Sequence, residues 1–177
     1  MELCESLKAE HDVILHVLDC IEKEAALAET GGTVRREFFS DAIAFVREFA
    51  DGVHHQKEEK ILFPRMVEAG VPKEGGPIGV MLYEHDEGRA HIRAMNDALP
   101  QAAAGDTKAR GLLIREARGY VSLLRAHIEK ENMILFPMAD RVFDQTEKAT
   151  IREAFAEAET NDQQVTEKRR RWAEALR

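Results

Sequence analysis

The chain has 177 residues, of which 44% are hydrophobic and 33% are charged, and its formal net charge is −8. This length suits one globular domain with a sizeable core. The acidic balance argues against a nucleic-acid or anionic-membrane surface. The N-terminus has no basic and apolar leader, and no apolar run reaches the roughly 20 residues that span a bilayer. Cys4 and Cys20 fall about 24 Å apart on one predicted helix, too far to pair. We therefore expect a cytoplasmic protein with free thiols.

Helical periodicity dominates the chain, and strand periodicity is nearly absent. Apolar residues recur every three or four positions in four long segments, which glycine-rich or proline-rich breaks separate. Four long helices joined by short loops predict an all-α fold, an up-down-up-down four-helix bundle. The predicted helices span residues 2–29, 34–69, 78–103 and 108–142.

Three prolines lie at the start of, or inside, these predicted helices. Pro77 suits the first position of the third helix. Pro64 and Pro137 lie inside the second and fourth helices, and we expect them to kink or end these helices at matching points.

The C-terminal tail has a helix start of its own. Asp144, with Glu147 three residues later, resembles a capping box, and apolar residues follow at helical spacing. We expect residues 1–143 to form the bundle and residues 144–177 to form one or two accessory helices packed outside it. The basic run 168–171 has glutamates on both sides, so we interpret it as a solvated helix end.

A repeated motif is the most informative feature of the sequence. The pattern H-x-x-K-E-x-x-I-L-F-P begins at His54 and again at His127, and each copy places a glutamate four residues after the histidine. A shorter Glu-His-Asp segment precedes each copy at nearly the same offset. The chain is therefore a doubled helix pair, and each half carries one lone His and one His-x-x-x-Glu.

These histidines and glutamates are expected to meet inside the bundle. Each occupies a position in the apolar stripe of its helix, and the two histidines of each hairpin fall within about 3 Å of the same height. One inward histidine is more often a hydrogen-bonded core residue than a ligand. Two carboxylates buried with four imidazoles, however, would cost several kcal/mol each unless paired or metal-bound. The predicted metal ligands are His11, His54, Glu58, His85, His127 and Glu131.

Mixed nitrogen and oxygen donors favour iron or manganese. Structural zinc takes four ligands, often thiolates, and calcium and magnesium would not recruit four imidazoles. Two octahedral ions have about twelve positions, of which the histidines, two bridging carboxylates and a shared oxo or hydroxo group fill about ten. The rest stay open for a small ligand. We expect two Fe ions, with Zn or Mn as substitutes.

The order His, His-x-x-x-Glu, His, His-x-x-x-Glu, with L-F-P after both paired motifs, resembles the hemerythrin-like (HHE cation-binding) domains over roughly residues 5–140. The resemblance implies a four-helix bundle with a non-haem di-iron centre that meets dioxygen, nitric oxide or peroxide. It also implies that His11 and His85 are the lone ligands and that Glu58 and Glu131 bridge the irons.

The third helix departs from the oxygen-carrying hemerythrins, which have H-x-x-x-H there and five histidines in all. Arg89 stands four residues after His85, and His91 lies about 120° round the helix, a poor substitute. The four-His, two-Glu set looks more like the di-iron proteins linked to nitric-oxide stress and iron–sulfur cluster repair. Those usually carry a small cysteine-bearing N-terminal domain, which we do not expect here because the first helix begins almost at once.

Several neighbouring residues have two interpretations. For His55 and Glu59, polar helical neighbours favour the rim of the site. The ring of Tyr120 is either a core aromatic or the carrier of a hydroxyl aimed at an iron-bound ligand. Gly88 allows either close packing or room for a diatomic molecule. One or two of the acidic residues beside the lone histidines are expected to bond an imidazole N–H; they are Glu10, Asp12, Glu84 and Asp86.

Three functions fit this pattern. The first is a protein that binds dioxygen or a related diatomic for sensing, storage or scavenging. The second is a redox enzyme acting on nitric oxide or peroxide or oxidising ferrous iron, or an iron donor in iron–sulfur cluster repair. The third is a structural role, in which metal stabilises the fold and the surface binds a protein partner or a second copy. No nucleic-acid or membrane partner is expected.

Overall fold

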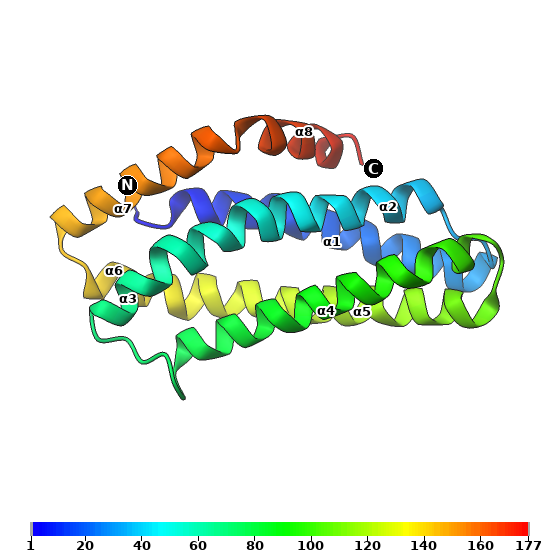
Figure 1. Cartoon of the computed structure of the whole chain (residues 1–177), viewed down its shortest axis with the longest axis horizontal. Helices are drawn as coiled ribbons and strands as arrows, with labels where there is room; N and C mark the ends of the chain where they lie inside the picture. Colours follow the sequence, from blue (N-terminus) through cyan, green and yellow to red (C-terminus); the bar gives the residue numbers. More distant parts are fainter. Residues whose placement is uncertain (1, 177) are drawn as a thin grey trace.

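Four antiparallel helical rods form the body of the computed structural model, which describes residues 2–176 (Figure 1). The all-α bundle predicted from the sequence is confirmed. The first rod is α1 (Glu5–Gly31), and the third is α4 (Pro77–Ala103). The second and fourth rods are built from shorter pieces, namely α2 (Arg36–Phe45), η1 (Val46–His55), η2 (Glu58–Leu62) and α3 (Phe63–Glu68), then α5 (Thr107–Lys130), η3 (Glu131–Leu135) and α6 (Phe136–Val142).

Local chemistry explains where the rods begin and end. Gly32, at φ 72°, ends α1 in the left-handed conformation that glycine adopts without strain, and its N–H donates to the Ala28 carbonyl. Pro77 opens α4, as predicted. Asp106 caps α5 by accepting a hydrogen bond from the Ala109 N–H. These stops keep the connections short, so that successive rods pack antiparallel.

The disturbances predicted at Pro64 and Pro137 take the form of π-helical segments. The segment η2 ends one residue before Phe63–Pro64, and η3 ends one residue before Phe136–Pro137. A proline has no N–H to donate and its ring crowds the carbonyl four residues earlier, so the preceding turn must widen or break. The second rod contains a further π-helical segment, η1, which has ten residues. The two halves of the repeat therefore differ in helical geometry.

The apolar core is divided into two clusters along the length of the bundle. One cluster packs around Phe39, Phe45 and Phe49 at the end near the α4–α5 turn. The other packs around Phe63 and Phe136 at the opposite end. Full burial of each phenylalanine contributes about 1.5–3 kcal/mol. Between the clusters lies a layer of buried polar side chains, which contains all six predicted ligands.

The C-terminal helices α7 (Gln145–Asn161) and α8 (Gln163–Glu174) run along the side formed by α1 and the second rod (Figure 1). The capping box of Asp144 and Glu147 is confirmed. No helix within residues 2–176 is long and apolar enough to cross a membrane.

The interpretation of the basic run 168–171 as a solvated helix end is partly wrong. Arg169 is buried, and its Nε donates to Glu48 Oε2 at 2.8 Å. The guanidinium of Arg170 lies over the Phe49 ring, 5.4 Å from its centroid. The two arginines therefore hold α8 against η1, because an acidic partner and an aromatic ring face them from that segment.

Candidate metal centre

The six predicted ligands come together in the polar layer between the two apolar clusters. Each of their side chains is at most 1% exposed. Glu131 approaches histidines of two rods, with Oε2 lying 3.1 Å from His11 Nε2 and Oε1 lying 3.2 Å from His127 Nε2. Glu58 does the same from the second rod, with 3.5 Å from Oε1 to His54 Nε2 and 3.5 Å from Oε2 to His85 Nε2. Each glutamate therefore lies between histidines of different halves of the repeat.

The inner atoms of this cluster lack the hydrogen bonds that buried polar atoms normally make. Both carboxylate oxygens of Glu58, both of Glu131, and Nε2 of His11 are buried without a hydrogen-bond partner in residues 2–176. Such atoms cost about 1–3 kcal/mol each, and more when charged. A cation would satisfy all of them at once, and mixed imidazole and carboxylate donors suit iron, manganese or zinc. The residues present fit a metal.

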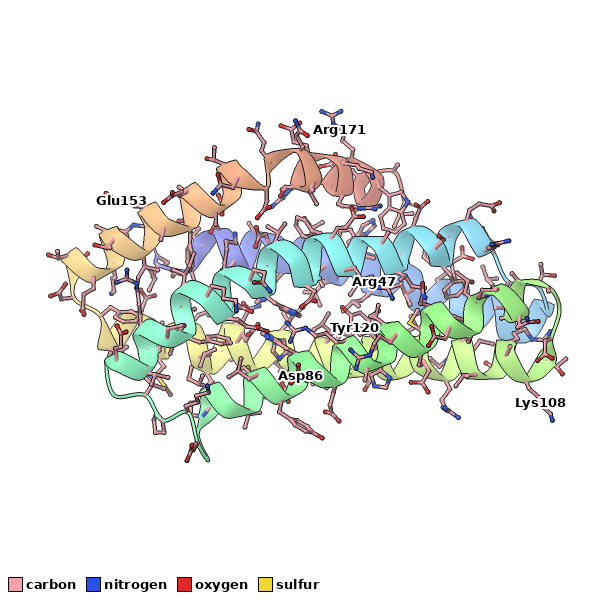
Figure 2. All side chains as sticks on the ribbon, in the orientation of Figure 1. Arg47, Asp86, Lys108, Tyr120, Glu153 and Arg171 are labelled. Carbon is pink, nitrogen blue, oxygen red and sulfur yellow. The ribbon has the colours of Figure 1, made fainter. Side chains whose placement is uncertain are left out.

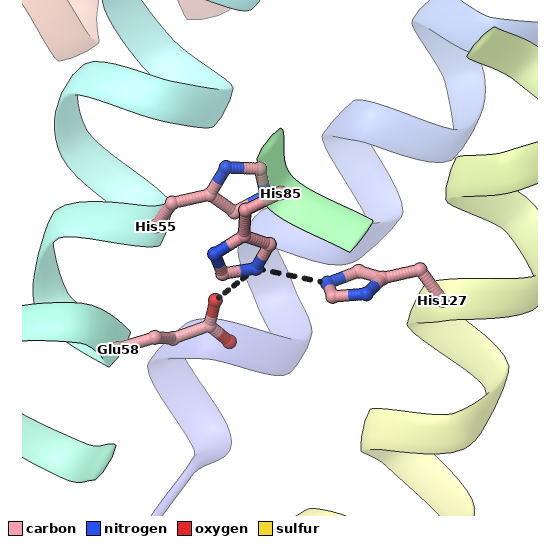
Figure 3. A group of neighbouring side chains, drawn as sticks. All are labelled: His55, Glu58, His85 and His127. Atoms are coloured by element: carbon pink, nitrogen blue, oxygen red, sulfur yellow. Dashed lines mark hydrogen bonds and ion pairs between the residues drawn. The ribbon is translucent and has the colours of Figure 1, made fainter. Parts of the chain in front are cut away.

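The donor atoms divide into two groups that share Glu58. One group contains His11, His54, Glu58 and Glu131, and the donor atoms lie within 4.8 Å of one another. The other contains His85 and His127, whose Nε2 atoms are 3.1 Å apart, together with Glu58 and His55 (Figure 3). Two adjacent groups with a shared carboxylate can hold two ions.

His55 is the residue that sequence reasoning misplaced. The rim location expected for it is wrong: its side chain is buried, and its ring stacks on that of His85 with centroids 3.8 Å apart. The expectation assumed α-helical steps of 100° between residues. His54 and His55 instead end the π-helical segment η1, in which hydrogen bonds span five residues and successive side chains are separated by a smaller angle. Both can therefore face the centre.

Each imidazole of the cluster contacts a further side chain through its Nδ1 atom. His54 meets Glu10 at 2.9 Å, and His127 meets Glu84 at 2.9 Å. These two glutamates are among the four acidic neighbours of which one or two were expected to bond an imidazole, and the other two, Asp12 and Asp86, are exposed. Such contacts leave Nε2 free for a metal and fix the orientation of the ring. The other Nδ1 partners are Asn132 for His11 at 2.9 Å, Glu59 for His85 at 2.7 Å and Asp51 for His55 at 3.3 Å.

These supporting contacts follow the sequence repeat. Glu59 and Asn132 hold equivalent places in the two copies, and so do the lysines of the H-x-x-K-E motif. Lys57 donates to Glu10 at 2.7 Å, and Lys130 pairs with Glu84. The motif lysine therefore anchors the glutamate that orients the motif histidine. The two copies differ at one buried position, because His55 in the first copy corresponds to Ile128 in the second.

Arg89 stands on α4 four residues after His85, and it supports the cluster rather than joining it. Its guanidinium donates to Asp51 and to Glu59, each at 2.7 Å. These carboxylates are the Nδ1 partners of His55 and His85. Arg89 thus positions two imidazoles indirectly, and η1 contributes the fifth imidazole. His91 lies outside the cluster and pairs with Glu116 at 2.8 Å.

Burial shapes the protonation of the inner residues. Burial, together with the nearby Glu131 carboxylate, raises the pKa of Glu58 well above its ordinary value. Burial and the neighbouring His11 lower the pKa of His54 to about 4, although Glu10 opposes the shift. His54 is therefore neutral near pH 7, as a metal ligand must be. Two adjacent buried carboxylates resist joint ionisation, and a cation would remove that penalty.

One cavity reaches the centre from its second group. It measures about 180 Å³, and His55, His85, Gly88 and Tyr120 are among the residues that line it. Tyr120 is 1% exposed and lies near the middle of the bundle (Figure 2). Its hydroxyl is buried without a hydrogen-bond partner in the described residues. The ring is thus a core aromatic, and the hydroxyl remains free to meet another molecule.

The family model of the hemerythrin HHE cation-binding domain matches residues 2–139. The chain belongs to this family. As a hemerythrin-domain protein it is a metal-binding helical bundle, and its buried histidines and glutamates form the candidate metal groups.

Among similar proteins, an uncharacterized protein of Mycobacterium tuberculosis is 25% identical over 155 residues, which is 88% of this chain and 60% of that protein. The iron-sulfur cluster repair protein YtfE of Musicola paradisiaca is 37% identical over 92 residues, 50% of this hemerythrin-domain chain and 40% of the relative. The YtfE protein of Dickeya chrysanthemi is 39% identical over 94 residues, with 50% and 41% covered. The chain thus spans about two fifths to three fifths of these curated relatives. No solved structure gives a significant match.

Proposed function

We propose that this domain holds two iron ions, bridged by Glu58 and Glu131, and binds dioxygen or a related small diatomic molecule for sensing, storage or scavenging. The observation that supports this most directly is the set of buried oxygens on the two glutamates, which have no hydrogen-bond partner and lie between two groups of histidines. Zinc or manganese would fit the same donors as substitutes.

The donor count differs between the two positions. His11 and His54 serve one position, whereas His85, His127 and His55 surround the other. With both glutamates shared, the first position has four protein donors and the second has five. Six-coordinate ions at the two positions would then leave more room for a small ligand beside His11 and His54 than beside His55, His85 and His127. Iron bound there would supply electrons and open coordination positions.

The surrounding residues would serve binding by keeping the site rigid and dry. The Nδ1 contacts hold each imidazole in one orientation. The two apolar clusters cover the layer from both ends. Apart from the donors themselves, Tyr120 is the only polar side chain with a free buried hydroxyl beside the centre in residues 2–176. Because few free polar groups are placed to give a proton to a bound ligand, the site favours reversible binding over proton-coupled turnover.

The test is anaerobic reconstitution with ferrous iron, followed by metal analysis and spectroscopy. We expect about two irons per chain and near-ultraviolet absorption that appears with oxygen and reverses on deoxygenation. His54→Ala should reduce the iron content, while His91→Ala, outside the cluster, should leave it unchanged. A His54→Ala variant with full iron content, or permanent oxidation in one cycle, would contradict the proposal.

A second candidate is a role in iron–sulfur cluster repair or in reactions of nitric oxide or peroxide. The similarity to the iron-sulfur cluster repair protein YtfE favours it, although the YtfE relatives align with only half of this chain. Catalysed loss of nitric oxide or peroxide over many turnovers, abolished by Glu131→Ala, would support the enzyme. Restoration of a damaged iron–sulfur protein by iron-loaded chain, but not by free iron, would support repair.

A further inference from the structure

The C-terminal helix α7 makes an ionic contact with the interior of the bundle through a buried lysine. Lys57 is 1% exposed, and its Nζ donates to Glu10 Oε1 at 2.7 Å and to Glu159 Oε1 at 2.8 Å. Glu10 belongs to α1, whereas Glu159 belongs to α7, which runs along the outside of the bundle (Figure 1). The other oxygen of Glu10 lies 2.9 Å from Nδ1 of His54. A continuous chain of side chains therefore joins the outer helix to a candidate metal ligand.

The effect of Glu159 on this chain follows from the way in which two carboxylates share the lysine. A metal ion on Nε2 of His54 leaves the ring proton on Nδ1, which then donates to Glu10. The charge of Lys57 weakens Glu10 as an acceptor, and Glu159 offsets part of that charge. A more negative Glu10 makes the imidazole a stronger metal ligand. Glu159 should therefore tighten the hold of His54 on its ion, although its own contact is with the lysine.

The second half of the repeat has the same chain without the outer carboxylate. Lys130 pairs with Glu84, and Glu84 lies 2.9 Å from Nδ1 of His127. Lys130 is 37% exposed, against 1% for Lys57, so water rather than a helix covers it. No second carboxylate pairs with Lys130 within residues 2–176. The two motif histidines therefore differ in their connection to the C-terminal helices.

The contact of Glu159 can be lost without unpacking the rest of α7. Phe155, one turn earlier, is 2% exposed and belongs to the apolar cluster that packs around Phe63 and Phe136. Glu159 itself is 39% exposed. Hollows of about 130 and 300 Å³ between α1 and the C-terminal helices both include Glu159 in their walls. The packing around this carboxylate is therefore incomplete, and water reaches it.

From these observations we infer that Glu159 is a positioning residue for the metal centre, through which the C-terminal helices control how tightly one of the two ions is held. The controlled ion is the one beside His11 and His54, and lifting α7 from the bundle would loosen it while leaving the other in place. The inference rests on the proposed function, because it concerns the retention of a bound ion. It goes further by giving a role to α7 and α8, which lie outside the matched residues 2–139.

The test is the anaerobic release of iron from fully loaded protein to an excess of a coloured ferrous chelator. Glu159→Gln keeps the size of the side chain and removes its charge, and Glu157→Gln makes the same change at an exposed position of α7. Loss of the partner that directly supports a metal-bound histidine weakens metal affinity about tenfold to a hundredfold. Glu159 acts from further away, so we expect release of one iron per chain to become about threefold to tenfold faster. The other iron, and both irons of Glu157→Gln, should leave at the wild-type rate.

A second measurement uses the reciprocity of coupled equilibria. If the docking of α7 tightens the ion, the ion must tighten the docking of α7 by the same factor. Loading the wild type with iron should therefore slow amide hydrogen exchange in residues 156–161, at the end of α7. Glu159→Gln should remove most of that slowing, and Glu157→Gln should retain it.

The outcomes separate this inference from the proposed function. Wild-type protein that takes up no iron overturns both. Iron-loaded Glu159→Gln that releases both irons at the wild-type rate overturns only the inference. Equal acceleration of both irons also overturns it, because a general loss of stability would then be the cause. Should Glu159→Gln fail to fold, wild-type exchange in residues 156–161 that does not respond to iron still overturns the inference.

Discussion

Lys57 connects Glu159 of the C-terminal helix α7 to the candidate metal centre. Its Nζ lies 2.8 Å from Glu159 Oε1 and 2.7 Å from Glu10 Oε1, and the other oxygen of Glu10 lies 2.9 Å from Nδ1 of His54. The lysine is 1% exposed, and Glu10 is 2% exposed. A charge buried to this extent depends on its partners, so the packing of α7 and the orientation of His54 are linked.

The two motif lysines should differ in their contribution to stability. Lys57→Met leaves Glu10 with an unbalanced buried charge, and breaking such a pair costs about 3–5 kcal/mol. Lys130 is 37% exposed, so water screens its pair with Glu84 and Lys130→Met should cost less than about 1 kcal/mol. Urea unfolding of metal-free protein measures both. Equal losses of unfolding free energy in the two variants would show that the different burial of the two lysines does not change their contribution to stability.

Metal removal should destabilise the fold. Ions that bind only the folded state add about 2.7 kcal/mol at a free concentration one hundred times their dissociation constant. We therefore expect a chelator to lower Tm by several degrees, because the inner oxygens of Glu58 and Glu131 are left buried without partners. Glu58→Gln should show a smaller shift on chelation. A wild-type Tm that does not change when metal is removed would contradict this prediction.

His55 should be needed for one of the two ions. Replacing it by leucine, which approximates Ile128 in the other half, removes a donor from the group of His85 and His127. We expect His55→Leu to retain the ion between His11 and His54 and to bind the other more weakly, so that iron content falls toward one per chain. Metal analysis at limiting iron measures this. His16→Leu, at an exposed position of α1, is the control.

The attachment of α8 should weaken in acid. The hydrogen bond from Arg169 lowers the pKa of Glu48 below its ordinary value of 4.5. A carboxyl with a lowered folded-state pKa stabilises the fold above its unfolded pKa, and that contribution disappears as the pH falls through the folded-state value. Glu48 is 42% exposed, so the contribution should stay below about 1 kcal/mol.

The difference in stability between wild type and Glu48→Gln measures this contribution. It should therefore be constant well above the unfolded-state pKa and disappear only once the pH has fallen through the lowered folded-state pKa of Glu48. A difference that persists at lower pH would mean that the carboxylate charge is not what holds α8.

The sequence predicted the rods, their turns and the depth at which the six residues meet. Helical periodicity and a repeated motif carry that information, because 1.5 Å per residue fixes the height of each side chain. It did not predict His55, since a change from α-helical to π-helical geometry alters direction without altering the pattern of residue types. Nor did it predict Glu59 and Asn132 as Nδ1 partners, because contacts between rods depend on rotation as well as height.

The division of the core has a mechanical consequence. Each end of the bundle is packed around its own apolar cluster, and the layer between the two clusters contains the buried ionisable side chains of the candidate metal centre. When cations are absent, the carboxyl groups of Glu58 and Glu131 cannot both ionise without repelling each other, and their inner oxygens are left buried without partners. The midsection should then open before either end, and amide exchange there should outpace exchange near the turns. Metal binding at the centre would couple the two ends of the bundle, so that they unfold as one cooperative unit.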